Sequence, residues 1–335
     1  MPANSLPAAP GAAVAAPGAT PIVFHAEESH ALFVPFLAAP RSLRMNGGAL
    51  LQGALAGLAS GGLYAVLAVT LTLMSRLVRV VNFAQAATGM FAAFAAVWCA
   101  SSLGLPVWAA TILGVVIGAA LNGAIGWIAA TWLSEASVTL RSAMTVAPLL
   151  MLISLSFILF GNKPQPFAPI LQGPAFTIAG VVVSWVTVVM VLLAVVVAAG
   201  CAILLRRTTV GTQLRALSER PTTAELIGIA AKPLSIGVWA VTGAISAITV
   251  MVIAPSQSND AISLSMLIIP ASAAALLGGF RRLDLAVVGG LLLGVISGVV
   301  AQIPAVSFVR NFIPFLFIVV LLLWSQRKEV WDAAR

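Results

Sequence analysis

Long apolar runs alternate with short charged segments over most of this 335-residue chain. About 20 apolar residues in a helix cross the hydrocarbon core of a bilayer, so we measured the stretches that lack Asp, Glu, Lys and Arg. Gly104 and Pro106 divide one long stretch into two spans. The segments near 82–102 and 145–161 are the weakest candidates, so eight spans are possible as well as nine. The nine predicted spans are 45–75, 82–102, 106–132, 142–162, 181–205, 233–259, 261–280, 285–309 and 311–326.

The composition makes these stretches membrane spans rather than buried helices of a soluble protein. Apolar residues (AVILMFWYC) make up 61% of the chain, charged residues make up 8%, and the mean hydropathy is +1.10. Soluble proteins carry about 25% charged residues. The predicted fold class is therefore all-α: a polytopic integral membrane protein with eight to nine transmembrane helices.

The distribution of basic residues predicts an orientation. The chain has 17 Lys and Arg residues against 9 Asp and Glu residues, a net charge of +8. With the N-terminus outside and nine spans, 13 of the 17 basic residues fall in inside segments and 4 outside, as the positive-inside rule requires. Residues 206–232 and the C-terminus are then cytoplasmic, residues 255–261 lie outside, and the chain sits in the inner membrane of the cell. No basic stripe with interleaved aromatic residues occurs, which excludes nucleic-acid binding.

The two ends of the chain differ from its middle. Residues 1–45 are rich in Ala and Pro, cannot bury a core, and are expected to be disordered. They do not form a secretory signal, because a basic start is missing and prolines interrupt any apolar run. Residues 46–326 form the predicted transmembrane domain, and residues 327–335 a short cytoplasmic tail.

Chemically reactive residues are scarce. No Asp, Glu, Lys, Arg or His lies deep in a predicted span, and the two histidines, His25 and His30, fall in the N-terminal tail. Cys99 and Cys201 lie in apolar runs and are expected to be buried thiols. Since neither a metal-ligand cluster nor a set of acids, bases and nucleophiles is assembled, we predict no catalytic residue, metal or cofactor, and no enzyme.

Polar residues inside the spans are candidates for a translocation path. The candidates are Tyr64, Asn82 and Gln85, and Gln52 and Asn122 are further polar residues in spans. An amide left unsatisfied in hydrocarbon costs several kcal/mol. In one interpretation Asn82 and Gln85 therefore face a wet cavity or a partner subunit. In the other they cap the helix that begins near residue 82 and contact no solute.

Glycines recur at four-residue spacing, which lets helix backbones approach closely in lipid. We expect them to pack helices within the subunit, with a subunit interface or a sliding gate as the alternative. The rows are Gly53, Gly57 and Gly61, then Gly290, Gly294 and Gly298, with the pair Gly114 and Gly118.

The longest inside segment, residues 206–233, reads as helix, break, helix. Its first part is polar with Val210, Leu214 and Leu217 at helical spacing. Pro221 can begin a second short helix and Gly228 stands where that helix would end. The segment is longer than a connector requires. A docking element for a cytoplasmic partner and a solvated loop along the membrane are both open.

Three blocks resemble the permease subunit of branched-chain amino acid ABC transporters, of the LivH type. Residues 57–85 resemble its first helix and the Asn-Phe-Ala segment that follows. Residues 206–252 resemble its coupling loop and the Gly/Ala-rich helix after it, and residues 275–295 resemble its late Gly-Gly segment. Two positions differ: Gln85 and Ala86 replace the usual His-Gly, and Arg281 replaces a common glycine.

The resemblance implies partners. It implies a second permease subunit, identical or not, together with two cytoplasmic ATP-binding subunits and an external solute-binding protein. None of the lysines Lys163, Lys232 and Lys328 follows a glycine, so the chain has no phosphate-binding loop of its own. The family docks a cytoplasmic helix in a groove of the ATPase, which assigns coupling to Arg215, Glu219, Arg220, Ala224 and Gly228.

The expected function is that of a membrane-spanning permease subunit of an ATP-driven importer of branched-chain or related amino acids. An importer of sugars or nucleosides from the same superfamily is one alternative. A secondary carrier of small amphipathic solutes and a membrane scaffold without transport are two others.

Overall fold

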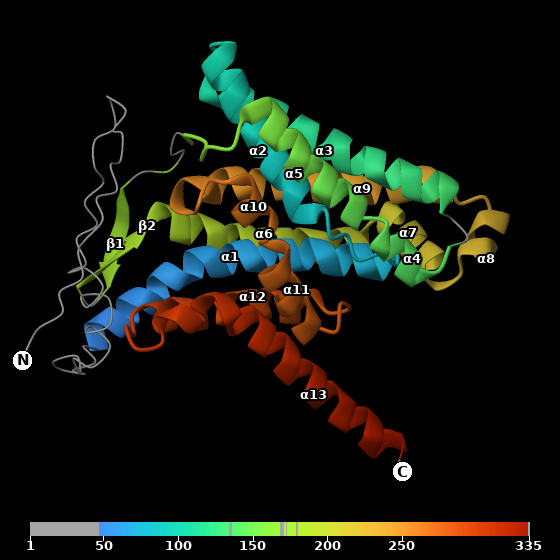
Figure 1. Ribbon diagram of the computed structural model, residues 1–335. Helices are drawn as coiled ribbons and strands as arrows, with labels where there is room; N and C mark the ends of the chain where they lie inside the picture. Colours follow the sequence, from blue (N-terminus) through green and yellow to red (C-terminus); the bar gives the residue numbers. More distant parts are fainter. Residues whose placement is uncertain (1–46, 134–135, 168–170, 172, 179, 334–335) are drawn as a thin grey trace, which may run out of the picture. The chain divides into compact units, whose positions relative to one another are not determined.

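A computed structural model describes residues 47–133, 136–167, 171, 173–178 and 180–333. The predicted N-terminal tail, with His25 and His30, lies outside the described residues. Most of the described chain is helical (Figure 1). The helices are α1 (Gly47–Leu77), α2 (Gln85–Ser102), α3 (Val107–Trp132), α4 (Val138–Ala143), α5 (Val146–Phe160), α6 (Trp185–Arg207), α7 (Thr209–Glu219), α8 (Pro221–Leu226), α9 (Ala231–Ile253), α10 (Ala261–Ser265), α11 (Ile268–Leu277), α12 (Leu283–Ala301) and α13 (Ile313–Ala333), with short 3-10 turns at Ala254–Ser256 and Ser307–Phe312.

Seven helical segments among the described residues are long and apolar enough to cross a membrane. These are α1, α3, α4 with α5, α6, α9 with the 3-10 turn that follows it, α12, and the 3-10 turn Ser307–Phe312 with the first part of α13. The remaining two predicted segments are also helical. The 18-residue helix α2 begins with Gln85 and ends with two serines, and the segment of residues 261–277 is shorter than a span.

The second of these segments is divided into α10 and α11. Asp260 caps α10, its Oδ1 accepting from the Ser263 backbone N–H at 2.9 Å. Pro270 lies in the first turn of α11. Because proline has no N–H to donate four residues back, a single helix cannot continue through this point, and the chain breaks between Ser265 and Ile268.

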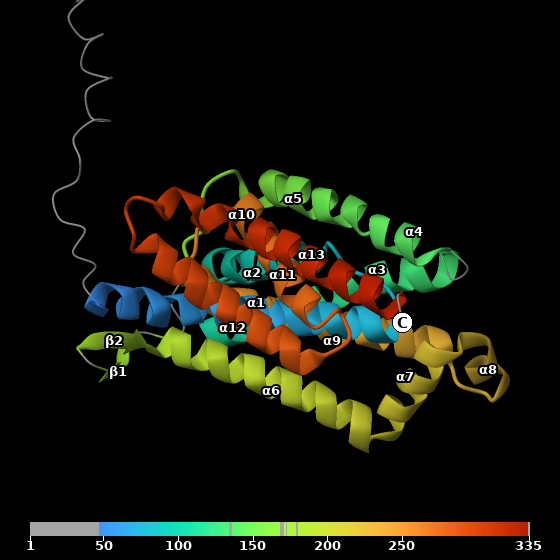
Figure 2. The same ribbon diagram turned by 90° about the horizontal axis from the view of Figure 1, so that it is seen from below.

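Helix α1 lies at the centre of the packing, with every residue from 65 to 74 buried. It lies beside both α12 and α6 (Figure 2). The two predicted glycine rows meet here: a Cβ on Gly53 would lie 2.5 Å from the Gly298 carbonyl oxygen, and one on Gly290 would overlap the Ala65 backbone. Glycine therefore allows α1 and α12 to touch backbone to backbone, which confirms the prediction that these rows pack helices within the subunit.

One predicted helix begins later than expected. Instead of a helix from residue 181, strand β1 (Pro174–Ile178) pairs antiparallel with β2 (Val181–Ser184), and α6 begins only at Trp185. Three consecutive valines favour an extended backbone, and Gly180 turns the hairpin at φ +80°. The Ser184 hydroxyl then accepts from the Thr187 N–H at 3.3 Å and caps α6. The all-α expectation thus has one small exception.

Exposed tryptophans gather near the ends of the spans. Trp98, Trp108 and Trp185 lie near the end of α2, the start of α3 and the start of α6, while Trp127 and Trp132 lie in the last turns of α3. Tryptophan prefers the membrane–water interface, where its ring is apolar and its N–H is wet. The exposed tryptophans therefore fit a membrane boundary at each end of the spans.

The last helix extends beyond the predicted spans. Helix α13 continues to Ala333, through most of the predicted tail 327–335.

Candidate functional site

A cluster of amide side chains joins three elements in the interior. Asn82 lies in the connection before α2, Gln85 is the first residue of α2, and Asn122 lies in α3. The Asn82 Nδ2 donates to the Gln85 Oε1 and to the Asn122 Oδ1, each at 2.9 Å. All three side chains are fully buried. The sequence marked all three as polar residues in spans but gave no sign that they meet.

Helix α9 completes this amide cluster. The Gln85 Nε2 donates to the Thr242 carbonyl oxygen at 2.8 Å and to the Ser246 Oγ at 2.6 Å. The Asn122 Nδ2 donates to the Trp239 carbonyl oxygen at 2.8 Å and to the Thr242 Oγ1 at 3.1 Å. Because the amides find protein partners on every side, their hydrogen bonds offset the cost of burying polar groups in an apolar region.

Close backbone packing makes room for the amide cluster. A Cβ on Gly118 of α3 would lie 2.7 Å from the Ala247 Cβ of α9, and a Cβ on Gly243 would collide with the Gly118 carbonyl. A Cβ on Gly89 of α2 would lie 2.8 Å from the Ser246 carbonyl oxygen. Larger residues at these positions would separate α2, α3 and α9 and pull the amides out of hydrogen-bonding range.

The connection that carries Asn82 is held from its other side. The Ser142 Oγ accepts from the Val81 N–H at 3.1 Å, and the Thr145 Oγ1 accepts from the Phe83 N–H at 2.9 Å. The Asn82 Oδ1 itself accepts from the Ala84 N–H at 3.0 Å. Asn82 therefore does satisfy a backbone donor just before α2, and it also joins a network that capping alone does not require.

The three predicted path residues lie in two separate places in the structure. Asn82 and Gln85 lie together in a closed network, so neither reaches a cavity or the surface in this conformation. Tyr64 lies on α1, half-buried, and packs in part against Leu293 and Ile313. No hydrogen bond among the described residues joins Tyr64 to the amide cluster. A role for these three side chains in translocation stays a prediction.

The predicted loop 206–233 folds as helix, break, helix. Helix α6 extends to Arg207, and α7 follows at once with the Thr208 hydroxyl as its cap. Leu214 and Leu217 are buried as their spacing suggests, but Val210 is exposed and Gly211 takes the buried position. Glycine is needed there because a Cβ would collide with the end of α6.

The five predicted coupling residues occupy different environments. Glu219 and Arg220 are exposed at the end of α7, and Ala224 of α8 is buried. Arg215 is half-buried and lines a cavity beside α6. The sequence missed that α8 ends in two exposed apolar side chains, Leu226 and Ile227.

Gly228 ends α8 as a helix stop. Its φ is +87°, a left-handed conformation that glycine adopts without strain. The Gly228 N–H donates to the Glu225 carbonyl and the Ile229 N–H to the Ala224 carbonyl, both at 3.0 Å. These two hydrogen bonds define a Schellman motif. Among the described residues, no atom beyond Gly228 and its two chain neighbours lies within 4 Å of where a Gly228 side chain would begin, so the surrounding space is open.

One residue that sequence reasoning did not select links the loop to α1. Arg79 follows the end of α1, has a φ of +57°, and its guanidinium donates to the carbonyl oxygens of Ser218 and Glu219. These carbonyls belong to the last turn of α7, where backbone acceptors lack helical partners. Arg79 therefore ties the end of α7 to the end of α1.

Comparison with known proteins gives the family. Residues 53–322 match the family described as branched-chain amino acid transport system / permease component. The probable branched-chain amino acid transport permease protein LivH of Methanocaldococcus jannaschii is 26% identical over 271 residues, which cover 78% of this chain and 84% of that protein. The high-affinity branched-chain amino acid transport system permease protein BraD of Pseudomonas aeruginosa is 24% identical over 294 residues, covering 82% and 93%.

Among solved structures, PsaBC from Streptococcus pneumoniae in complex with Fab aligns with a TM-score of 0.44 and 18% identity, over 81% of this chain and 90% of that chain. The family match runs from within α1 into α13 and takes in every membrane-length helix between them. This multi-pass membrane protein belongs to the family of branched-chain amino acid transport permease components.

Proposed function

We propose that the chain is the membrane-spanning subunit of an ATP-driven importer of branched-chain or related amino acids. The family match and the two relatives support the substrate class. The proposed assembly holds a second permease subunit, two cytoplasmic ATP-binding subunits and an external solute-binding protein. In the proposed orientation the N-terminus is outside, and the loop of α7 and α8 faces the cytoplasm together with the C-terminus.

The observation that carries the coupling proposal is the tip of α8. Leu226 is 87% exposed and Ile227 is 72% exposed, and both lie at the end of α8. The distribution of arginines predicts that this helix lies in the cytoplasm, outside the hydrocarbon core of the membrane. Two adjacent, large and highly exposed apolar side chains form a contiguous apolar patch of the kind that marks a protein–protein contact. Ala224 is buried beneath this tip, and Arg79 fixes the preceding helix to α1. The loop thus offers an ATPase an apolar contact on a support joined to a transmembrane helix.

A transport assay tests both substrate and coupling. The chain is coexpressed with candidate ATPase and permease partners and reconstituted in vesicles with a candidate solute-binding protein. We expect uptake of leucine, isoleucine or valine that requires ATP hydrolysis. Uptake of a sugar or nucleoside instead would move the chain to the alternative importer class. Uptake driven by an ion gradient without ATP would contradict the ATP-driven reading.

Substitutions at the α8 tip test the docking contact. Leu226→Ser with Ile227→Ser removes the apolar side chains without filling space, so we expect the permease to insert normally while ATPase copurification and solute-stimulated ATP hydrolysis fall together. Phe308→Ser is the matched control, since Phe308 is also 72% exposed but lies in the 3-10 turn before α13, on the predicted outside. Full ATPase binding by the double variant would remove the tip from the contact.

A further inference from the structure

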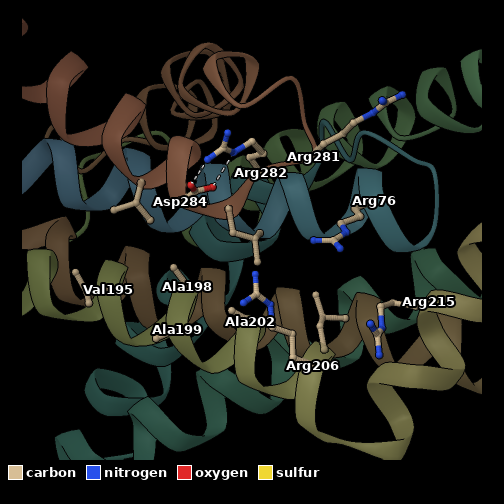
Figure 3. Close-up of a pocket in the computed structure, with 13 residues that line it drawn as sticks. Arg76, Val195, Ala198, Ala199, Ala202, Arg206, Arg215, Arg281, Arg282 and Asp284 are labelled. Atoms are coloured by element: carbon tan, nitrogen blue, oxygen red, sulfur yellow. Dashed lines mark hydrogen bonds and ion pairs between the residues drawn. The ribbon is translucent and has the colours of Figure 1, made fainter.

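A basic cavity of about 750 Å³ lies between the ends of α1 and α6 and the start of α12. Figure 3 shows Arg76 and Arg206 directed into the same gap from facing helices, with Arg282 and Asp284 across it. Arg215 and Arg281 lie farther along its edge. The sequence assigned all five arginines to the predicted inside, and the structure brings them to one site.

The positive charge of this cavity is largely uncompensated. Among the described residues the cavity holds one acid, Asp284, which is bound to Arg282 at 2.7 Å. That hydrogen bond raises the pKa of Arg282 above its usual value. Arg76, Arg206 and Arg281 have no side-chain partner in the described part of the chain, and the Arg215 Nε is buried without one. Arginines gathered in this way favour an anion, for which phosphate oxygens offer several charge-assisted acceptors.

The rest of the lining is apolar and extends into the membrane. Val195, Ala198, Ala199 and Ala202 line the cavity from α6, and Val287 lines it from α12. Val195 and Arg206 are 11 positions apart, which is about 16 Å along a helix. Half of a bilayer core is about 15 Å thick. The apolar part therefore has the depth of one leaflet, with the arginines at the interface where a headgroup lies.

We propose that this cavity binds an anionic phospholipid, with the headgroup phosphate between Arg76 and Arg206 and one acyl chain along α6. Basic pockets between transmembrane helices suit such headgroups. A zwitterionic amino acid fits less well, because its ammonium would need a carboxylate and Asp284 is already bound to Arg282. A soluble phosphate would gain nothing from the apolar lining.

Native mass spectrometry of the full-length chain in a mild nonionic detergent tests the proposal. We titrate dioleoyl phosphatidylglycerol, dioleoyl phosphatidylcholine with the same acyl chains, and glycerol 3-phosphate, which has the anionic head without the chains. We expect tight binding of the phosphatidylglycerol alone. Equal binding of both lipids would overturn the role of the arginines. Glycerol 3-phosphate binding as tightly as the lipid would overturn the lipid in favour of a soluble anion.

Charge variants locate the site. A basic residue near an anionic membrane surface contributes about fivefold in affinity, so Arg76→Gln and Arg206→Gln together should weaken phosphatidylglycerol binding about 25-fold. Arg310→Gln removes a single positive charge, the same change as each of the two substitutions alone, from an exposed residue in the turn before α13, and it should leave binding unchanged. Equal effects of the double variant and the Arg310→Gln control would contradict the site.

A second pair of variants tests the acyl-chain groove. Ala198→Phe fills the cavity lining, whereas Val196→Phe enlarges an exposed side chain of the same helix that does not line the cavity. We expect only Ala198→Phe to lower lipid binding, with both variants retaining the wild-type elution volume and melting temperature in phosphatidylcholine. Unchanged lipid binding by Ala198→Phe would overturn the placement of the chain. The assay needs neither ATPase nor transport, so its failure leaves the proposed function unaffected.

Discussion

The guanidinium of Arg79 lies 3.2 Å from the carbonyl oxygen of Glu219, and the two residues are 140 positions apart in the chain. Through this hydrogen bond and its neighbour on Ser218, the end of α7 is fixed to the connection that follows α1. The connection continues to Asn82, which lies inside the amide cluster. A displacement of the α7–α8 loop therefore reaches the interior through four residues of backbone.

We expect Arg79→Gln to loosen the loop without unfolding the membrane domain. A hydrogen bond from a charged donor contributes about 1.5–3 kcal/mol, and the exposure of Arg79 reduces this to about 1 kcal/mol. Hydrogen exchange should then quicken about fivefold at amides of α7 and α8 and stay unchanged in α3. Solute-stimulated ATP hydrolysis should decrease in the same variant. Arg207→Gln, at an exposed arginine that ends α6, is the control, and equal exchange rates in all three proteins would contradict the link.

Gly243→Ala should destabilise the membrane domain, since the new Cβ would collide with the Gly118 carbonyl and approach the Asn122 Cβ. Overpacking of this kind costs about 1–3 kcal/mol. Gly237→Ala is the matched control in the same helix, because no described atom beyond its chain neighbours and the adjacent α9 backbone lies within 4 Å of its added Cβ. Thermal unfolding in detergent compares the two. A melting temperature for Gly243→Ala equal to that of Gly237→Ala would mean that α3 and α9 can separate at no cost.

Asn122→Leu should leave a buried amide donor unsatisfied. The Asn82 amide would lose its acceptor on Asn122, at a cost of about 1–3 kcal/mol, whereas the Trp239 carbonyl would keep the Thr242 hydroxyl as a donor at 2.9 Å. Gln302→Leu, at an exposed glutamine that ends α12, should have little effect on the melting temperature.

The path role of the amides needs a separate measurement. Asn82→Leu and Gln85→Leu are compared for expression, melting temperature and solute uptake. If they stabilise a closed state only, uptake should change in proportion to the folded protein. If they line the path in another conformation, uptake per folded protein should fall. Normal uptake with normal expression would remove both residues from the path.

Gly228 distinguishes a helix stop from a docking surface. The left-handed φ predicts that Gly228→Asn is tolerated and that Gly228→Ala costs about 1–2 kcal/mol. Because the space around Gly228 is open within the chain, Gly228→Trp should fold normally. Weaker ATPase binding by the Trp variant would then report a partner close to this position. Full transport by the Trp variant would contradict docking at this position and would mean that Gly228 serves only to end α8.

Cysteine labelling tests the orientation. Cys99 and Cys201 are both buried and are replaced by Ala to give a chain without thiols. Thr222 of α8 and Ser258 before α10 are exposed, so each accepts a single cysteine that a membrane-impermeant maleimide can reach. We expect Ser258→Cys to label in intact cells and Thr222→Cys only after the membrane is opened. The reverse result would invert the topology.

The sequence predicted best where the determinant is local. The lengths of the apolar stretches predicted where the spans lie, and Pro221 and Gly228 predicted the bounds of α8. The glycine rows predicted a close contact between helices. The hairpin before α6 was missed, because a short run of valines fits a strand as well as the start of a helix.

The site depended on distant residues. Asn82 meets Asn122 across 40 positions, and Arg79 meets Ser218 across 139. Polar character in a span announces that a partner exists but not which one, because the partner is set by how α3 and α9 pack. The cavity arginines illustrate the same limit: their common side of the membrane was predictable, and their common site was not.

The glycine contact between α1 and α12 has a mechanical consequence. Each glycine faces backbone on the other helix, so a slide by one residue would bring a side chain such as that of Leu291 into a space without room for it. The two helices can therefore pack in only one register, and they must move together as one rigid unit. Any change between outward-open and inward-open states therefore has to bend or rotate the chain elsewhere. The break between α10 and α11 is one place where the helical backbone is already interrupted, and α11 packs against both α1 and α12.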